Sequence, residues 1–518
     1  MDKILILDFG GQTSQLIGRR IREAGVYAEI LQGDCELTDE VLTKDVKGVI
    51  LSGSPNSVYE KNSPKPDKRV YSLDIPVLGI CYGLQIITHE NGGVVIPLDK
   101  KEYGRSAISF KMNDSPLIKG IPDNFISWMS HGDSLDKLAP GFELVGMSEH
   151  NLPAIVENRE KKIWGLQFHP EVTHCEQGNA ILENFAINIC GAIKSWSMDK
   201  YIEEASERLH KQVGVNKVLL LISGGVDSTV AGGFLLKCLK PENVFLMYID
   251  TGMMRKNETE EVSKNLKKLG AKNLLIIDAR NRFLGPLKGI SDPEAKRRSI
   301  GDTFIRVQEE EVAKHIKGDY FLAQGTLYTD LIESGKGVGN KAGVIKSHHN
   351  VGTPLVEKKR KEGKIVEPLD MLYKDEVRKL GLLLGIEDKI VFRHPFPGPG
   401  LGIRIPGEVT EERCEILREA DAIYIEELHK RDLYTQIWQA FSVLLPVRSV
   451  GVAGDARDYG YVLALRAVVS HDGMTADVFD FPMKDLLEIS SAITNRVKEI
   501  GRVVYDISSK PPSTIEWE

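Results

Sequence analysis

A short run of small residues around an aspartate is the part of the sequence with the clearest chemistry. The run consists of Ser223, Gly224, Gly225, Val226, Asp227 and Ser228. It lies between the apolar stretch 217–222 and a segment that we expect to be helical from Ser228 onward. At a strand-to-helix turn, small residues let backbone N–H groups approach an anion, and the helix N-terminus adds positive potential. The Asp227 carboxylate would repel a bare phosphate, so we expect a nucleotide polyphosphate together with a bridging Mg²⁺.

An ordinary glycine-rich turn is the alternative interpretation of this run. The run is not a Walker A loop, because no G-x-x-x-x-G-K-[ST] string occurs in the chain. It resembles instead the pyrophosphate-binding loop of the ATP pyrophosphatase family, whose members cleave ATP between the α- and β-phosphates and adenylylate a carbonyl oxygen. The resemblance implies an adenine-nucleotide α-hydrolase-like fold in which all six residues bind ATP and Asp227 binds the metal. It leaves the acceptor open.

A cysteine between small residues is the second candidate for chemistry. Cys81 follows the apolar stretch 77–80 and precedes Tyr82 and Gly83, where a helix is expected to begin. Small neighbours permit a sharp turn that exposes the thiol, as in G-x-S-x-G elbows, and a helix N-terminus favours the thiolate. The N–H groups of Tyr82 and of Gly53, which lies in a turn after another strand, are then placed to stabilise an oxyanion. The alternative is a buried structural cysteine.

His169 and Glu171 supply a base and a group that orients it. Pro170 disfavours the helical conformation at His169, so this segment is expected to be extended. In an extended segment residues i and i+2 point the same way, so the carboxylate can hold the imidazole. We therefore interpret Cys81, His169 and Glu171 as a nucleophile, base and orienting carboxylate rather than as structural side chains.

The motifs around these residues, G-x-C-x-G and H-P-E, resemble those of the class I (triad) glutamine amidotransferase family over roughly the first 196 residues. The resemblance implies thioester formation at Cys81, release of ammonia and hydrolysis of the glutamyl-enzyme. It also implies that Gln85, His131 and Asp133 line the glutamine pocket.

Longer motifs resemble the glutamine-hydrolysing GMP synthase family, and this resemblance covers the whole chain. They are residues 324–334, 345–350, 393–404 and 509–518. The resemblance implies that the acceptor is xanthosine 5′-monophosphate (XMP), whose O2 attacks the α-phosphorus of ATP before ammonia displaces AMP at C2 to give GMP. It further implies a homodimer formed through the C-terminal region. The implied XMP contacts are Arg297, Gln436, Asp455, Lys510 and Glu516, with Arg298 as an alternative to Arg297. A docked tail with only a packing role is the alternative for Lys510 and Glu516.

The elements that must position these residues alternate along the chain. Strands are predicted at residues 4–7, 48–51, 77–80, 163–168, 217–222, 244–249, 274–277 and 320–323. Short apolar runs between amphipathic segments predict the α/β class, with parallel sheets covered on both faces in two domains, residues 1–196 and 197–394. Residues 395–518 are predicted to form a small α+β dimerisation domain, with helices at 408–430 and 485–499 and strands at 449–452, 459–469 and 502–507. The Pro- and Gly-rich run 394–402 is interpreted as a linker, and 335–364 as a loop over a site.

Composition restricts the function classes. The 518 residues include 67 Lys and Arg against 74 Asp and Glu, a net charge of −7, which argues against broad electrostatic binding to nucleic acid or to an anionic membrane. The basic run 358–361 is therefore interpreted as a solvated loop rather than a nucleic-acid patch. No stretch reaches the roughly 20 apolar residues of a membrane span, and the first residues are too short an apolar run for a signal peptide. Six scattered cysteines without a C-x-x-C pair argue against a zinc site or disulfide framework and fit a reducing cytoplasm.

Three competing hypotheses remain weaker. An NAD synthetase with a glutaminase is expected to carry a different amidase domain, without H-P-E. A tRNA-modifying enzyme would be expected to show a stronger basic surface or paired cysteines. A non-catalytic nucleotide sensor would be suspected if Cys81, His169 or Asp227 were replaced, and all three are present.

Overall fold

The chain forms two compact units. The computed structural model describes residues 1–333, 353–453, 456–470 and 475–518. One unit consists of Met1–Glu204 with Tyr328–Ser347, and the other of Ala205–Leu327 with His348–Glu518. The division into three domains with boundaries at 196/197 and 394/395 stays a prediction, and the second of these boundaries falls inside the second unit.

The first unit is built on a nine-stranded sheet with the strand order β2-β1-β3-β4-β9-β8-β7-β5-β6. Its parallel strands are β1 (Lys3–Asp8), β2 (Tyr27–Gln32), β3 (Val46–Leu51), β4 (Val77–Ile80) and β9 (Ile163–Leu166). Antiparallel strands continue the sheet as β5 (Val94–Phe110), β6 (Phe125–Lys137), β7 (Glu143–Ser148) and β8 (Pro153–Asn158). The parallel-rich α/β architecture is confirmed, whereas β2 and all four antiparallel strands were not anticipated.

Helices cover this sheet because its central strands are apolar on both faces. All four residues of β4 are buried, as are five of the six in β3. The helical elements are α1 (Ser14–Glu23), η1 (Lys68–Ser72), α2 (Tyr82–Glu90), η2 (Pro116–Ile118), α3 (Gly178–Glu183) and the π-helical η3 (Asn184–Ile189). The helix α4 (Met198–Val213) begins in this unit and continues into the second. Among the described residues no helix is long and apolar enough to cross a bilayer.

A helix from the middle of the chain, α9 (Tyr328–Glu333), belongs to this first unit. The Ile30 N–H donates to the Tyr328 hydroxyl at 2.5 Å. The Arg22 guanidinium carbon lies 4.7 Å from the ring centre of Tyr27, 5.0 Å from that of Trp196 and 4.8 Å from that of Tyr328. A buried cation among three rings therefore anchors the start of α9.

The second unit contains a parallel five-stranded sheet with the order β12-β11-β10-β13-β14. The strands are β10 (Lys217–Ile222), β11 (Val244–Asp250), β12 (Asn273–Asp278), β13 (Tyr320–Ala323) and β14 (Ile365–Val366). The helices are α5 (Val226–Cys238), η4 (Pro241–Asn243), α6 (Glu258–Lys268), α7 (Arg280–Leu287), α8 (Pro293–His315), α10 (Pro354–Lys361), α11 (Lys374–Leu383) and α12 (Asp388–Val391).

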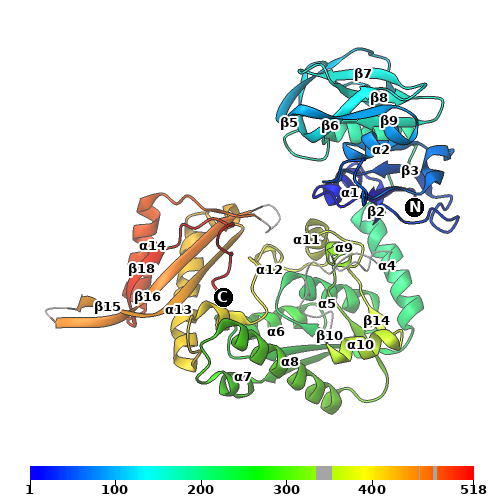
Figure 1. The fold of residues 1–518 in the computed structure, drawn as a ribbon. Helices are drawn as coiled ribbons and strands as arrows, with labels where there is room; N and C mark the ends of the chain where they lie inside the picture. Colours follow the sequence, from blue (N-terminus) through cyan, green and yellow to red (C-terminus); the bar gives the residue numbers. More distant parts are fainter. Residues whose placement is uncertain (334–352, 454–455, 471–474) are drawn as a thin grey trace. The chain divides into compact units, whose positions relative to one another are not determined.

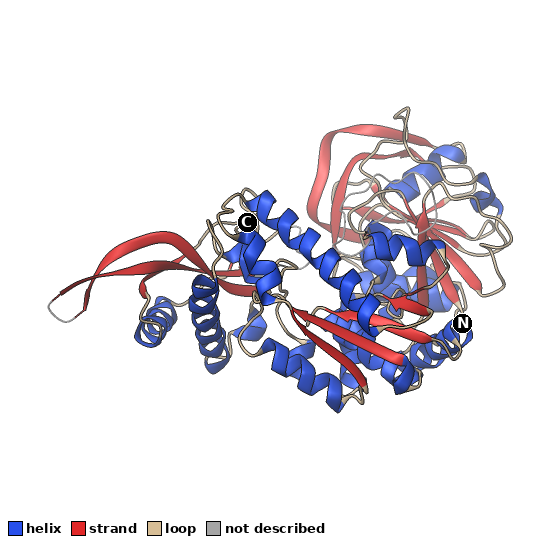
Figure 2. Cartoon of the chain, turned by 90° about the horizontal axis from the view of Figure 1, so that it is seen from below, coloured by secondary structure: helices blue, strands red, loops and turns tan. Residues whose placement is uncertain are grey.

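The rest of the second unit carries a smaller, mainly antiparallel sheet. Its elements are η5 (Gly400–Arg404), α13 (Glu411–Lys430), η6 (Tyr434–Gln436), β15 (Gln439–Ala453), β16 (Ala456–Val469), β17 (Asp477–Val478), α14 (Met483–Arg496) and β18 (Ile500–Tyr505). β15 and β17 pair antiparallel with β16, and β18 pairs parallel with it. The β15–β16 hairpin is much longer than anticipated and reaches past α13 and α14 (Figures 1 and 2).

Three interpretations of connecting segments are corrected. The run 394–402 is not a free linker, because the Leu401 N–H donates to the Met253 carbonyl at 2.8 Å and a Cβ at Gly400 would lie 2.3 Å from the same oxygen. The loop prediction is wrong for 354–361, which form α10, while its part at 335–352 lies outside the described residues. The basic run 358–361 therefore lies in a helix and not in a loop. Lys359 is buried, with Nζ 3.8 Å from the Tyr320 ring centre, whereas Lys358 and Lys361 are exposed as expected.

Candidate active sites

Cys81 occupies a strained turn between β4 and α2. Its φ is 52° and its ψ −107°, a conformation that non-glycine residues rarely adopt. The glycines on either side are required by close packing: a Cβ at Gly83 would lie 2.2 Å from the Leu51 carbonyl oxygen, and one at Gly79 would lie 2.6 Å from the Gly83 carbonyl carbon. The turn leaves Cys81 at the carboxyl end of the parallel strands, beside the N-terminus of α2.

The imidazole of His169 is oriented by the carboxylate of Glu171. Nδ1 of His169 lies 2.7 Å from Oε1 of Glu171, and the side chain of Glu171 is 1% exposed. Burial lowers the pKa of His169, but the Glu171 charge and hydrogen bonds to Cys81 and Glu171 outweigh burial and raise it well above its ordinary value. Since Nδ1 faces the carboxylate, Nε2 is the nitrogen left for the thiol.

One cavity of about 740 Å³ joins most of the residues predicted for glutamine hydrolysis. Its lining includes Gly53, Cys81, Gln85, His131, Asp133 and His169. Gly53 lies directly against the reacting groups, since a Cβ there would be 3.1 Å from Cε1 of His169 and 3.8 Å from Cβ of Cys81. Tyr82 directs its ring elsewhere, with its hydroxyl donating to the Pro64 carbonyl at 2.6 Å, so only its backbone N–H is available for the predicted oxyanion role.

The three predicted glutamine-pocket residues are linked to one another. Nε2 of Gln85 donates to the Asp133 carbonyl at 2.8 Å, and Nδ1 of His131 lies 2.9 Å from the same oxygen. The Asp133 carboxylate accepts the Ser57 hydroxyl at 2.5 Å. Gln85 and His131 therefore shape the cavity wall by holding the backbone at Asp133.

Glu102, which the sequence analysis did not identify, supports this wall. Its carboxylate lies 3.0 Å from Nε2 of His131 and 2.7 Å from Nδ1 of His150. Burial raises the pKa of Glu102, but hydrogen bonds from His131, Ser148 and His150 outweigh it and hold the pKa below its usual range. No local motif marks Glu102, because its partners come from other strands.

The run predicted to bind ATP forms an open turn at the start of α5. Gly224 has a φ of +78°, Gly225 is the N-cap, and Ser223 and Gly225 are exposed. The Ser228 hydroxyl accepts the Ser223 N–H at 3.2 Å and donates to the Gly225 carbonyl at 3.1 Å, which fixes the turn. The N–H groups of the first helical turn have no partner within the helix and give the turn an anion-binding character.

The predicted metal ligand, Asp227, forms an ion pair that the sequence analysis did not anticipate. Nζ of Lys374, in the first turn of α11, lies 2.6 Å from both carboxylate oxygens. Across the described ranges no cluster of three or more His, Cys, Asp or Glu side chains is arranged to hold a metal. A lone carboxylate still suits Mg²⁺, which is bound in nucleotide sites by one or two carboxylates, water and phosphate oxygens.

Comparisons with known proteins cover each part of the chain. Residues 5–189 match the model of the glutamine amidotransferase class-I family, residues 199–283 that of NAD synthase, and residues 426–517 that of the GMP synthase C terminal domain. A GMP synthase [glutamine-hydrolyzing] from Aquifex aeolicus is 52% identical over 515 residues, 99% of each chain. One from Caldicellulosiruptor saccharolyticus is 51% identical over 516 residues, again 99% of each.

The chain belongs to the glutamine-hydrolysing GMP synthase family. It is therefore a carbon–nitrogen ligase that combines a class I amidotransferase part with an ATP pyrophosphatase part.

The structure places the XMP contacts implied for a GMP synthase in separate surroundings. Asp455 lies outside the described residues. Arg297 donates to the Glu518 carbonyl, and the Lys510 backbone forms an antiparallel bridge with Ala476. The Glu516 carboxylate accepts hydrogen bonds from Arg404 at 2.8 and 3.0 Å.

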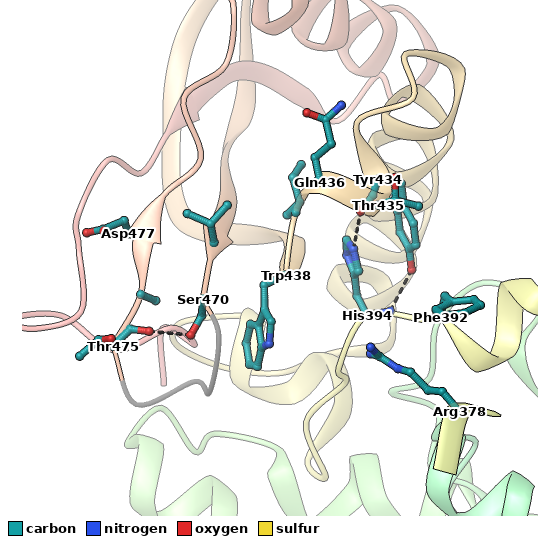
Figure 3. Close-up of a pocket in the computed structure, with 13 residues that line it drawn as sticks. Arg378, Phe392, His394, Tyr434, Thr435, Gln436, Trp438, Ser470, Thr475 and Asp477 are labelled. Atoms are coloured by element: carbon teal, nitrogen blue, oxygen red, sulfur yellow. Dashed lines mark hydrogen bonds between the residues drawn. The ribbon is translucent and has the colours of Figure 1, made fainter. Parts of the chain in front are cut away.

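Gln436 lines a cavity of about 470 Å³ but does not meet the tail. Its amide donates to the Asp432 carbonyl at 2.9 Å and points away from Trp438 and Arg378 (Figure 3). The glutamine that does contact Glu516 is Gln439, whose Nε2 donates to Oε1 at 2.7 Å. The two glutamines lie three positions apart, and the local sequence holds no signal that distinguishes them.

Proposed function

We propose that the chain aminates XMP to GMP with ammonia from glutamine, through an adenylyl-XMP intermediate, and releases AMP, pyrophosphate and glutamate. Family membership supports the overall reaction. The observation that carries the proposal is that a thiol, its base and its orienting carboxylate converge in the first unit, while the second unit carries an open anion-binding turn with an aspartate.

The first half-reaction uses the cavity around Cys81. The thiolate attacks the side-chain amide carbon of glutamine, and His169 carries the thiol proton to the departing ammonia. Water then attacks the thioester, with His169 taking its proton and Cys81 leaving as the thiolate. Glu171 holds the imidazole through Nδ1, and the N–H groups of Gly53 and Tyr82 stabilise each tetrahedral oxyanion.

The second half-reaction uses the turn from Ser223 to Ser228. Its N–H groups and the helix terminus bind the phosphates that leave as pyrophosphate. The O2 atom of XMP attacks the α-phosphorus, and ammonia then adds at C2 and expels AMP. Asp227 would hold Mg²⁺, which supplies positive charge to the phosphates when bound. Lys374 lies within reach of the same carboxylate and offers a second cation there.

Binding of XMP is assigned to Arg297, Gln436, Asp455, Lys510 and Glu516, as the family resemblance implies. A homodimer through the C-terminal region is supported by exposed apolar side chains on the β15–β16 hairpin, where Val450 is 52% and Val452 81% exposed. A cytoplasmic location stays a prediction, compatible with six unpaired cysteines.

Two variants and one exchange assay test the proposal. Cys81→Ala is expected to abolish synthesis from glutamine and to leave synthesis from ammonium salts, with Cys35→Ala as the matched control. Asp227→Ala is expected to remove both, because adenylylation serves either nitrogen source. XMP-dependent exchange of labelled pyrophosphate into ATP identifies the acceptor directly. Use of glutamine by the Cys81 variant would refute the proposed glutamine half-reaction. Pyrophosphate exchange that does not need XMP would refute XMP as the acceptor in the second half-reaction.

A further inference from the structure

Fully buried cations hold the last residues of the chain. Arg466, 0% exposed, donates to the carbonyls of Thr514 and Ile515. Lys296, also 0% exposed, lies 2.5 Å from a carboxylate oxygen of Glu518. Arg404, 1% exposed, pairs with Glu516. Burying a cation is costly unless its partner is well placed, so each contact requires a defined position of the tail.

The pair between Arg404 and Glu516 has the most restrictive geometry of these contacts. Nε donates to Oε2 at 3.0 Å and Nη2 to Oε1 at 2.8 Å, so the two planar groups meet side by side. The guanidinium carbon lies 4.1 Å from the ring centre of Phe441 and 5.1 Å from that of Phe396. Two rings therefore fix the plane of the guanidinium, and the guanidinium fixes the plane of the carboxylate.

The remaining surroundings leave Glu516 one way to bind a ligand. Gln439 donates to Oε1 at 2.7 Å, so that oxygen already accepts two hydrogen bonds. Oε2 accepts only the Nε–H of Arg404 among the described residues and keeps a lone pair. The Glu516 side chain is 19% exposed, whereas Arg404 is sealed off. Oε2 is thus the part of the cluster that can accept a hydrogen bond from a ligand.

A buried ion pair is weak evidence of a stabilising role. Replacing a buried ion pair by apolar residues of similar volume is often neutral or stabilising. A second carboxylate, Asp421, is buried near Arg404. It accepts a hydrogen bond from the Ser442 N–H at 2.7 Å, so its hydrogen bonding does not depend on Arg404. The two parallel N–H donors of Arg404, here called the fork, give the Oε2 lone pair of Glu516 a fixed direction.

We propose that Arg404 is a positioning residue for the nucleotide substrate: it orients Glu516 as an acceptor for a ring N–H or hydroxyl of XMP. This inference rests on the proposed function and adds a residue that touches no substrate. A lysine at 404 keeps the charge but offers neither the fork nor a plane that stacks on Phe441. The charge-conserving variant is therefore the informative one.

The test is steady-state kinetics of ammonia-dependent GMP formation by the full chain. Arg404→Lys is expected to raise KM for XMP at least tenfold, with kcat changed less than threefold and KM for ATP unchanged. Arg431→Lys, which alters a partly buried arginine paired with Glu427 and Glu488, is the matched control and is expected to leave KM for XMP unchanged.

A double-mutant cycle separates positioning from a general structural role. If Arg404 acts through Glu516, Arg404→Lys in a Glu516→Gln background should change KM for XMP by less than twofold. The inference would be overturned if the two substitutions raised KM for XMP independently, so that their fold-changes multiplied in the double variant. It would also be overturned if Arg404→Lys alone left KM for XMP unchanged. Should Arg404→Lys fail to fold, Phe441→Leu removes one stacking ring and leaves the fork atoms. It is expected to raise KM for XMP two- to fivefold, and no rise would also overturn the inference. Absence of GMP formation by the unaltered chain would instead refute the proposed function.

Discussion

Glu171 reaches back two residues to hold His169, with Oε1 2.7 Å from Nδ1. Glu171→Gln removes the charge and keeps the shape. We expect glutaminase turnover to fall by about 10²–10⁴-fold, because the imidazole loses both its orientation and the stabilisation of its cationic form. Ammonia-dependent synthesis should be unaffected. Glu160→Gln, on an exposed residue of the same unit, is the matched control.

The same variant should change the pH dependence of stability. The pKa of His169 is raised well above its ordinary value, so the protonated form is favoured in the folded protein. This contribution is fully present below the unfolded-state pKa of about 6.5 and is lost as pH rises through the folded-state pKa. The midpoint temperatures of thermal unfolding of the original chain and of Glu171→Gln should differ most near pH 6 and converge at alkaline pH. A difference that grows with pH would contradict the assigned direction.

Cys81 is expected to be the most reactive of the six thiols. Burial raises the pKa of the others, to about 11 for Cys35 and to about 12 for Cys175 and Cys414. Cys81 instead faces His169 at a helix N-terminus. At pH 7 iodoacetamide should therefore modify Cys81 at least about tenfold faster than any other cysteine. Peptide mass spectrometry measures each rate, and equal labelling of Cys35 and Cys81 would count against an activated thiol.

The part of this protein that could be predicted from sequence is the part encoded over a few residues. The elbow at Cys81, the H-P-E segment at His169 and the turn at Asp227 each combine a strand, a conformational requirement and a reactive group within about ten positions. Parallel strands were found because burial on both faces makes them continuously apolar. The antiparallel strands β5 to β8 have a weaker pattern and were not found.

Residues that act through distant partners could not be predicted. Lys374 lies 147 positions from Asp227, and Arg404 lies 112 positions from Glu516. Nothing near either residue in the sequence indicates its partner, because the pairing depends on which helix or turn packs beside the other. Gln439 was missed for a related reason: only the packed position of the tail distinguishes it from Gln436.

Adding a single methyl group at three glycines should give three different outcomes. Gly83→Ala would place Cβ 2.2 Å from the Leu51 carbonyl and should destabilise the first unit by about 1–3 kcal/mol. In Gly53→Ala the new Cβ would lie 3.1 Å from Cε1 of His169 and 3.8 Å from Cβ of Cys81, with no backbone in close contact, so we expect lower glutaminase activity with little loss of stability. Gly301→Ala, in α8 with nothing within 4 Å, should be neutral or slightly stabilising.

Calorimetry and glutaminase assays of these three variants provide the comparison. The Gly53 variant is the informative one, since its activity should fall about tenfold while ammonia-dependent synthesis stays normal. Unchanged glutaminase activity in Gly53→Ala would mean that the turn after β3 is not part of the reacting site.

Lys374 should matter for ATP and not for glutamine. Its Nζ lies 2.6 Å from both oxygens of Asp227, at the mouth of the turn predicted to bind the phosphates. Lys374→Met removes a cation that balances this carboxylate and the incoming phosphates, so we expect KM for ATP to rise about tenfold or more, with glutaminase activity unaltered. Lys379→Met, on the exposed side of the same helix, controls for general effects on α11. If Lys374→Met had the same KM for ATP as Lys379→Met, Lys374 would be only an ion-pair partner of Asp227. The turn would then have to bind the nucleotide through its N–H groups and the metal alone.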